Sequence, residues 1–196
     1  MTEENMQNIS TILLDMYGVI IEESKGNFIP YTYEHFNEIE YERLTKQFRQ
    51  EQLFTRAGNG EISSDMFLTL LGYENPQYHM TNYLLNYLTL DSAFITFAEK
   101  YYRSIDFVIV SGNVKCRKPD KQIFEIALEK INKKPSECII VDNSVANLNV
   151  SKKIGICPIL FNRDNVEYTG ITVNTFEELA DLLSNSLICK RNTLST

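Results

Sequence analysis

Continuous apolar runs alternate with amphipathic segments along much of this chain of 196 residues. A short run without polar alternation is typical of a strand that is buried on both faces of a sheet. The chain has four such runs and a shorter fifth candidate, at Ile12–Leu14, Phe107–Val110, Cys138–Val141, Ile156–Phe161 and Ile171–Val173. Strands that alternate with helices predict an α/β fold with a parallel sheet and right-handed crossovers.

The long stretch between the first two apolar runs breaks this alternation, because its composition is helical throughout. Within it, Ser63 is a good helix N-cap and Gly72 a good helix stop, which predicts a short helix between them. We expect residues 28–88 to form a small helical cap over the C-terminal end of the first strand. Residues 1–27 and 89–196 should form a Rossmann-like core with helices on both faces of the sheet.

Composition narrows the class of protein. The formal charge of −7 argues against a nucleic-acid surface, and no apolar run reaches the ~20 residues of a membrane helix. The N-terminus lacks the basic-then-apolar pattern of a signal peptide. The four cysteines are scattered without the spacing of a disulfide framework or a zinc site: Cys116, Cys138, Cys157 and Cys189. We therefore expect a cytoplasmic protein without nucleic-acid or membrane partners, and the sequence leaves its oligomeric state open.

Polar side chains follow three of the predicted strands. Asp15, Ser111 and Asp142 each end an apolar run, and Lys118-Pro119 lies between the second and third. The carboxyl ends of parallel strands meet at one edge of a sheet, so these groups should converge there. Their chemistry suits attack on a phosphoryl centre, with Asp15 as nucleophile and with Ser111 and Lys118 holding phosphoryl oxygens. Asp15 and Asp142 would share a Mg²⁺ ion.

Four segments together resemble the haloacid dehalogenase-like (HAD) hydrolase superfamily: LLDMYGVI (13–20), VSGN (110–113), CRKPDKQIFEIAL (116–128) and VDNSVANLNVSKKIG (141–155). The resemblance covers roughly residues 9–24 and 91–183. It implies a Mg²⁺-dependent phosphatase that acts on a small phosphorylated metabolite through an aspartyl-phosphate.

The resemblance also implies a role for each matching residue. Asp15 matches the nucleophile, and Lys118 matches the charge-neutralising lysine. The metal ligands would be Asp15, the backbone carbonyl of Tyr17, and Asp142. Substrate would contact Lys118, Ser111 and the adjacent Gly112, and Asn143 occupies a position where many members have another acid.

Tyr17 departs from the phosphatase pattern, in which a second Asp protonates the leaving group. A tyrosine with a pKa near 10 is a poor general base at neutral pH and a weak acid. Asp-x-Tyr-Gly also resembles the 2-haloacid dehalogenases, in which Asp displaces halide and no metal is required. Asp142 favours the metal-dependent branch. A dehalogenase and a catalytically degenerate binding protein remain as alternatives.

The segment between Ser111 and Lys118 is short for this superfamily. Either one βα unit is missing, or Ser111 belongs to the strand before the lysine and the true second motif is lost. A central strand that lacks a neighbour would be exposed at the edge of the sheet.

Overall fold

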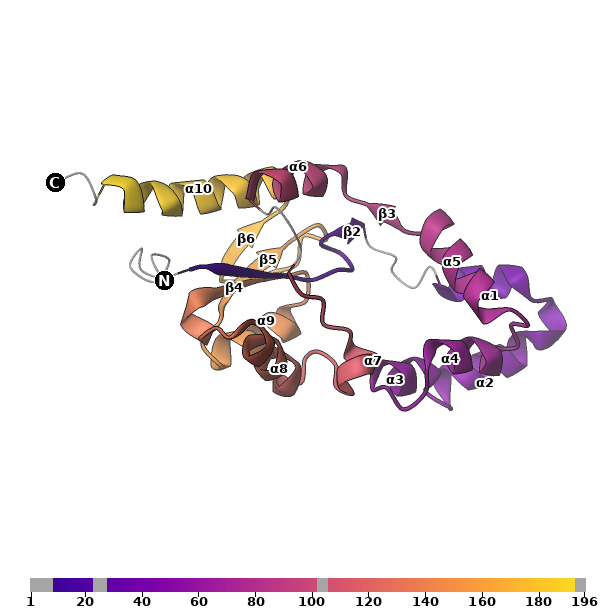
Figure 1. Ribbon diagram of the computed structural model, residues 1–196. Coiled ribbons are helices and arrows are strands. Elements are labelled where there is room, and N and C mark those ends of the chain that lie inside the picture. The colour runs from indigo at the N-terminus through magenta and orange to yellow at the C-terminus, as the bar shows by residue number, and fades with distance from the viewer. Residues whose placement is uncertain (1–8, 23–27, 102–105, 193–196) are drawn as a thin grey trace.

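The computed structural model describes residues 9–22, 28–101 and 106–192 (Figure 1). Its main sheet has four parallel strands in the order β1-β4-β5-β6. These are β1 (Thr11–Leu14), β4 (Cys138–Asp142), β5 (Cys157–Phe161) and β6 (Ile171–Val173). The parallel α/β sheet predicted from the sequence is confirmed.

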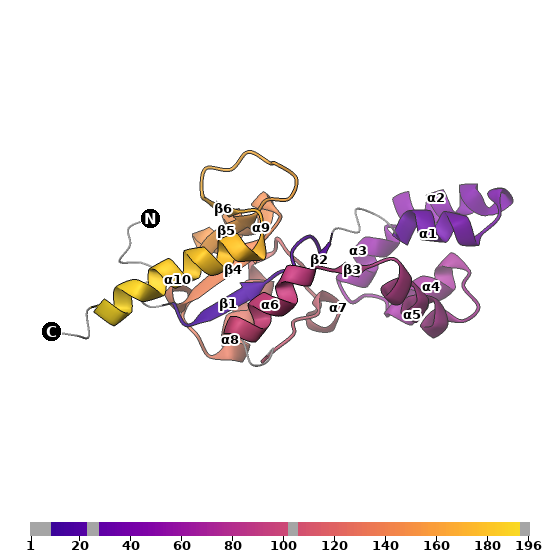
Figure 2. The same cartoon turned by 90° about the horizontal axis from the view of Figure 1, so that it is seen from above.

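Helices cover both faces of this sheet (Figures 1 and 2). Ile139 and Val141 of β4 pack in one apolar cluster with residues of α6 (Ser92–Tyr101) and α10 (Phe176–Asn192). Cys138 and Ile140 point to the opposite face, where they join residues of α8 (Lys121–Ile131) and α9 (Val145–Lys153). All residues of β4 are buried, as the unbroken apolar run predicts.

The helix start at Ser63 and the helix stop at Gly72 that the sequence predicts are confirmed. Ser63 caps α4 (Ser64–Leu71), since its side chain accepts a hydrogen bond from the Met66 amide at 3.1 Å. Gly72 ends that helix with a φ of 100°, a conformation that glycine adopts without strain. Asp120 caps α8 in the same way through the Gln122 amide, which fixes the start of the helix next to Lys118.

The predicted strand at 107–110 is wrong. Phe107, Val108 and Val110 lie outside any helix or strand, and their side chains are 54%, 68% and 49% exposed. Ser111 then begins the short helix α7 (Ser111–Val114), which contacts α3 (Leu53–Gly58) instead of the sheet. Within the described residues, the sheet therefore ends at β1, whose residues are all only half-buried.

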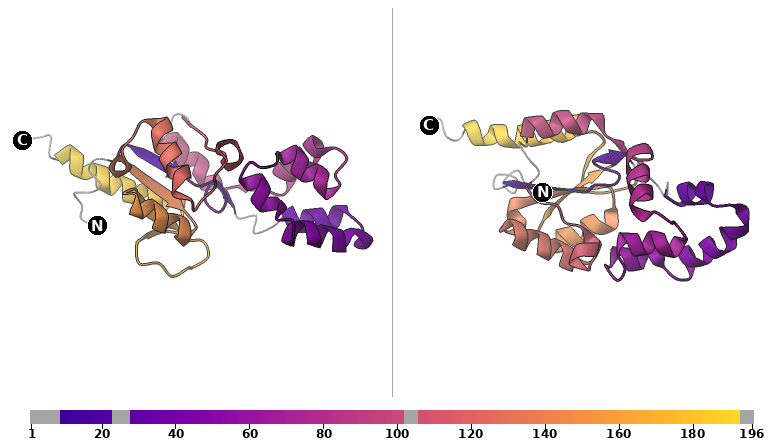
Figure 3. Two further views of the ribbon diagram at one scale, coloured as in Figure 1. Left: turned by 90° about the horizontal axis from the view of Figure 1, so that it is seen from below. Right: turned by 45° about the vertical axis from the view of Figure 1, so that its right-hand side comes forward.

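The insertion, residues 28–88, is helical and buries an apolar cluster of its own (Figure 3). Besides α3 and α4 it contains α1 (Phe28–His35), η2 (Glu38–Glu40), α2 (Tyr41–Arg49) and α5 (Pro76–Asn86). An antiparallel ribbon of β2 (Ile21–Glu22) and β3 (Thr89–Leu90) connects it to the sheet. A further short helix, η3 (Pro135–Glu137), precedes β4.

Two findings bear on the expectations from composition. In the part of the chain that the structure describes, no helix combines the length and the apolar character needed to cross a membrane. The described cysteines Cys116, Cys138 and Cys157 are free thiols.

Candidate active site

Lys118 lies between two carboxylates at the C-terminal edge of the sheet. Its Nζ is 2.7 Å from Asp15 Oδ1 and 2.5 Å from Asp142 Oδ2. The two aspartates are close because β1 and β4 are neighbours, and the Asp15 amide donates to the Val141 carbonyl at 2.9 Å. The structure therefore brings together Asp15, Lys118 and Asp142, three of the residues singled out in the sequence.

Asp142 is fully buried, and donors surround its carboxylate. Oδ1 accepts hydrogen bonds from the Ser144 amide at 2.8 Å and from Asn147 Nδ2 at 3.0 Å. Oδ2 accepts from Lys118 Nζ and, also at 3.0 Å, from Asn147 Nδ2. Sequence reasoning missed Asn147. Its signal was a polar residue in the first turn of a helix that directly follows a predicted site residue.

Asp15 is more accessible, with a side chain that is 19% exposed. Its Oδ1 accepts hydrogen bonds from the Met16 amide at 2.8 Å and from Lys118. Within the described residues, the contacts of this carboxylate go to Oδ1, which leaves Oδ2 for a reacting atom. Asp15 is thus held firmly on one side and open on the other, as a nucleophile requires.

The charge of Lys118 is secured by its neighbours. Burial opposes the charge, but the carboxylates of Asp142 and Asp15 raise the pKa of Lys118 above its ordinary value. Lys118 is therefore an ammonium at neutral pH. One ammonium and two carboxylates leave the cluster with a net charge of about −1 when both acids are ionised.

Tyr17 lies on the loop after β1 with its side chain 43% exposed. Burial, the nearby Tyr83 of α5, and Asp15 together raise the pKa of Tyr17 above its ordinary value of 10. Its hydroxyl is therefore protonated at neutral pH, so that it can donate a proton but cannot act as a base. Tyr83 also shows that the insertion approaches the site.

The predicted magnesium ligands do not fit this arrangement. A carboxylate offers about four lone-pair sites, and three donors already surround Asp142: Lys118 Nζ, the Ser144 amide, and Asn147 Nδ2, which lies 3.0 Å from both oxygens. A cation shared by Asp15 and Asp142 would have to displace Lys118 Nζ from between them. In the described ranges, no group of three His, Cys, Asp or Glu side chains could hold a metal ion.

The remaining predicted residues lie elsewhere. Ser111 and Gly112 belong to α7, and the Gly112 carbonyl lies close against Gly60 of the insertion, where a Cβ would come within 2.1 Å of it. Ser111 is therefore placed against the insertion and not at the end of a sheet strand. Asn143 follows Asp142 and lines a small cleft together with Gly18 and Arg163.

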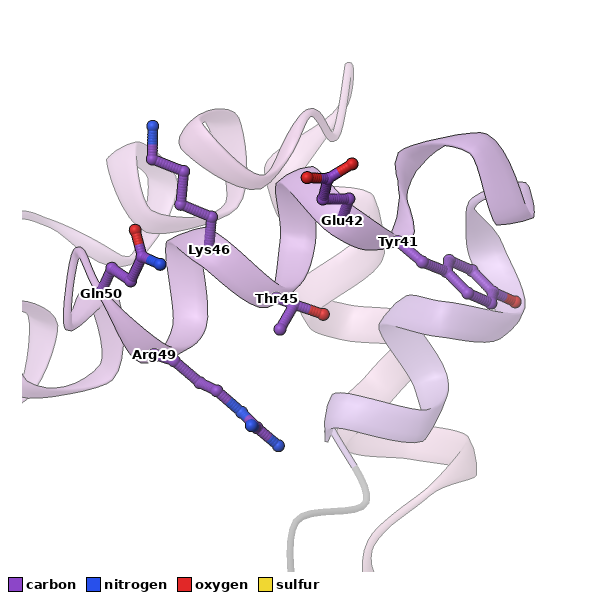
Figure 4. A pocket seen from close by; sticks show the side chains of 6 residues that line it. All are labelled: Tyr41, Glu42, Thr45, Lys46, Arg49 and Gln50. Atoms are coloured by element: carbon purple, nitrogen blue, oxygen red, sulfur yellow. The ribbon is translucent and has the colours of Figure 1, made fainter.

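A larger groove of about 480 Å³ is lined by residues of α2 and by Gln50, which follows it (Figure 4). Glu42 and Lys46 point to one side of the helix and Arg49 to the other, so these side chains do not converge on one ligand. The hydroxyls of Tyr41 and Thr45 are already engaged with Tyr33 of α1. This groove does not contribute to the site around Asp15.

No protein family model matches the chain. Among solved structures, it is similar to a HAD family enzyme from Bacteroides thetaiotaomicron in complex with magnesium and inorganic phosphate, with 16% identity, a TM-score of 0.62 and coverage of 82% of this chain and 98% of that one. A HAD phosphatase from Thermococcus onnurineus has 16% identity and a TM-score of 0.63, covering 89% of this chain and 98% of that one. A dehalogenase has 18% identity and a TM-score of 0.58, with coverage of 89% and 96%.

These similarities extend over most of both chains, but the identities are too low to transfer an activity or a substrate. They agree with the parallel sheet and the helices that cover it. The chain therefore has the fold of the haloacid dehalogenase-like hydrolases.

Proposed function

We propose that this chain is a HAD-type hydrolase that transfers a phosphoryl group from a small phosphorylated molecule to Asp15. The observation that carries the proposal is the position of Lys118 Nζ, 2.7 Å from one oxygen of Asp15. The ammonium orients the carboxylate and can stabilise negative charge on a phosphoryl group bound beside it. We also propose that the helical insertion acts as a cap that controls access, since Tyr83 of α5 lies near Tyr17.

In the first step, Asp15 Oδ2 attacks phosphorus and the bond from phosphorus to the leaving oxygen breaks. The leaving oxygen takes a proton from the Tyr17 hydroxyl where it needs one. In the second step, water attacks the phosphorus of the aspartyl-phosphate, the bond from phosphorus to Asp15 Oδ2 breaks, and inorganic phosphate leaves. A proton of that water returns to Tyr17 where Tyr17 has given one, and otherwise stays with the phosphate. No step is assigned to a metal ion, because the predicted ligand set does not fit.

A 2-haloacid dehalogenase is the second candidate, and the position of Lys118 Nζ between Asp15 and Asp142, where a shared cation would lie, favours it. A phosphate dianion would meet a cluster with one cation and two anions, whereas a 2-haloacid carries a single negative charge. Here Asp15 Oδ2 would attack the carbon that bears the halogen, and the halide would leave with the bonding electrons and without a proton. Water would then hydrolyse the ester on Asp15.

The test is turnover of a substrate panel, with Mg²⁺ and separately with EDTA. The panel contains acetyl phosphate, an aryl phosphate, a sugar phosphate and 2-chloropropionate. We expect phosphate release, and we expect Asp15→Asn to lose it to background without a change in melting temperature. Halide release alone would support the second candidate. If neither product forms under either condition, the proposed hydrolase function is wrong.

A further inference from the structure

Arg163 reaches from the end of β5 to the loop that follows Asp15. Its Nε donates to the Gly18 carbonyl at 3.3 Å, and its Nη2 donates to the Val19 carbonyl at 3.1 Å. The same Nη2 forms an ion pair with Asp91. The guanidinium also lies over the Phe161 ring, 4.8 Å from its centre, which restricts its orientation.

Asp91 is also fixed by hydrogen bonds to the start of α6 and to Ile20. Its Oδ1 caps α6 by accepting hydrogen bonds from the amides of Ala93 at 2.8 Å and Phe94 at 3.2 Å. Its own amide donates to the Ile20 carbonyl at 3.0 Å. Arg163 and Asp91 thus bind the carbonyls of three successive residues, 18 to 20.

The loop that they bind is the one that positions Tyr17. It is closed internally by hydrogen bonds from the Ile21 amide to the Met16 carbonyl and from the Gly18 amide to the Ile21 carbonyl, both at 2.8 Å. Gly18 has a φ of 78°, which favours glycine there. Both connections between sheet and insertion also start here, because β2 follows the loop and β3 precedes Asp91.

We propose that Arg163 and Asp91 form a positioning pair, which fixes the Met16–Ile21 loop relative to Asp15 and anchors the β2–β3 ribbon at the base of the insertion. Neither residue touches the Asp15 carboxylate, so the pair acts through the loop. The kinetic consequence rests on the proposed function, whereas the structural consequence does not.

The structural test is amide hydrogen exchange in Arg163→Met, with Arg49→Met as the matched control. Arg49 lies on the outer face of α2, so its replacement removes the same charge far along the chain from the loop. Loss of the charge-assisted hydrogen bonds should speed exchange at Gly18, Ile21 and Asp91 by ~10-fold or more, with β4 unchanged. Unchanged exchange at these amides in Arg163→Met would overturn the proposal.

A second variant, Asp91→Asn, separates the ion pair from the helix cap. Asparagine also caps helices well, so α6 should keep its start while the charge that pairs with Arg163 is lost. The amides of Gly18, Ile21 and Asp91 should exchange faster in Asp91→Asn. In the double variant, the free-energy change for exchange should be smaller than the sum of the changes in the two single variants. Fully additive effects would show that the two residues do not act as a pair.

The kinetic test uses the best substrate from the panel. A displaced loop should lower kcat by ~10-fold in both variants while KM changes by less than ~2-fold, because binding groups outside the loop are untouched. If both variants only lower the amount of active protein, and kcat and KM of that active protein stay unchanged, the pair has a merely structural role. That result would overturn the proposed effect on kcat. If no substrate is found, the exchange measurements still decide whether the pair holds the loop.

Discussion

At the scale of single residues, Lys118 is the group on which the site depends. Asp15 and Asp142 lie on neighbouring strands, and without a cation between them their charges would repel each other. Lys118 supplies that cation from the segment just before α8, where the Asp120 cap fixes the chain. In the proposed reaction, Tyr17 would determine which leaving groups the site can serve, because its hydroxyl would supply the proton that the leaving oxygen needs.

The role of Tyr17 predicts a dependence on the leaving group. The acetate of acetyl phosphate and the aryloxide of an aryl phosphate leave without a proton, whereas the alkoxide of a sugar phosphate needs one. The wild-type protein should therefore cleave the first two substrates far faster than a sugar phosphate. Tyr17→Asp should raise the rate on the sugar phosphate by up to ~10²-fold and do little for acetyl phosphate, since general acid catalysis contributes ~10²–10⁴-fold. The measurement is the ratio of kcat/KM for the two substrate types.

Tyr17→Phe is the control for this prediction, because it keeps the ring and removes the only proton that the side chain can donate. It should slow cleavage of the sugar phosphate and leave that of acetyl phosphate unchanged. Equal effects of Tyr17→Asp on both substrate types would contradict a role of position 17 in leaving-group protonation.

At the scale of elements, the sequence correctly placed the aspartates that follow paired strands and misplaced Ser111, because the run before Ser111 does not form a strand. Asp15 and Asp142 follow apolar runs that do form adjacent parallel strands, so their convergence could be derived from the pattern. Ser111 follows a run of the same composition that does not pair. A run of four apolar residues does not reveal whether a helix after it will dock on the sheet or, as α7 does, on α3.

The exposure of Val108 gives a direct test of whether residues 107–110 lie outside the sheet. Val108→Lys should change the free energy of unfolding by less than about 0.5 kcal/mol, because the side chain already lies in water. Ile140→Ala in the buried strand β4 is the positive control and should cost about 2–5 kcal/mol. Both values can be measured by urea unfolding. A loss for Val108→Lys as large as that of the control would mean that the segment is a buried strand in solution.

The contact of α1 with α5 predicts a pH dependence. Burial and the neighbouring His35 lower the pKa of His79 from its ordinary value of 6.5, and the Tyr31 hydroxyl lies 3.0 Å from its Nδ1. The folded protein therefore binds a proton less readily than the unfolded chain. Stability should be full above about pH 6.5 and should fall as the pH drops below that value.

Melting temperatures at pH 7.5 and pH 5 in wild type and in His79→Gln would measure this effect. The variant has no imidazole at this position and should lose less stability on acidification than the wild type. Its matched control is a glutamine substitution of an exposed residue of α5 such as Leu85→Gln, which should keep the wild-type response. An identical loss in all three proteins would assign the acid sensitivity to other groups.

At the scale of the whole molecule, apolar packing is divided between the sheet and the insertion. The clusters on the two faces of the sheet contain residues of its strands and of α6, α8, α9 and α10, whereas the insertion packs on its own aromatic and leucine residues. The β2–β3 ribbon and the contact of α3 with α7 link the two regions. The break in strand–helix alternation predicts an insertion at this point of the sequence, but the sequence gives no sign that α7 forms the second link.

This division predicts that the insertion can unfold while the sheet stays folded. Leu68 of α4 and Leu148 of α9 are both fully buried, one in each region, so replacement by alanine should cost about 2–5 kcal/mol in either case. Leu68→Ala should speed amide exchange in α1 to α5 alone, because few apolar contacts pass the loss on to the sheet. Leu148→Ala should speed exchange in β4 and α9. If both variants instead speed exchange equally throughout the chain, the protein unfolds as one cooperative unit. An insertion that opens on its own would provide the access to Asp15 that a cap requires, whereas a single cooperative unit would leave rigid-body movement at the β2–β3 ribbon as the route.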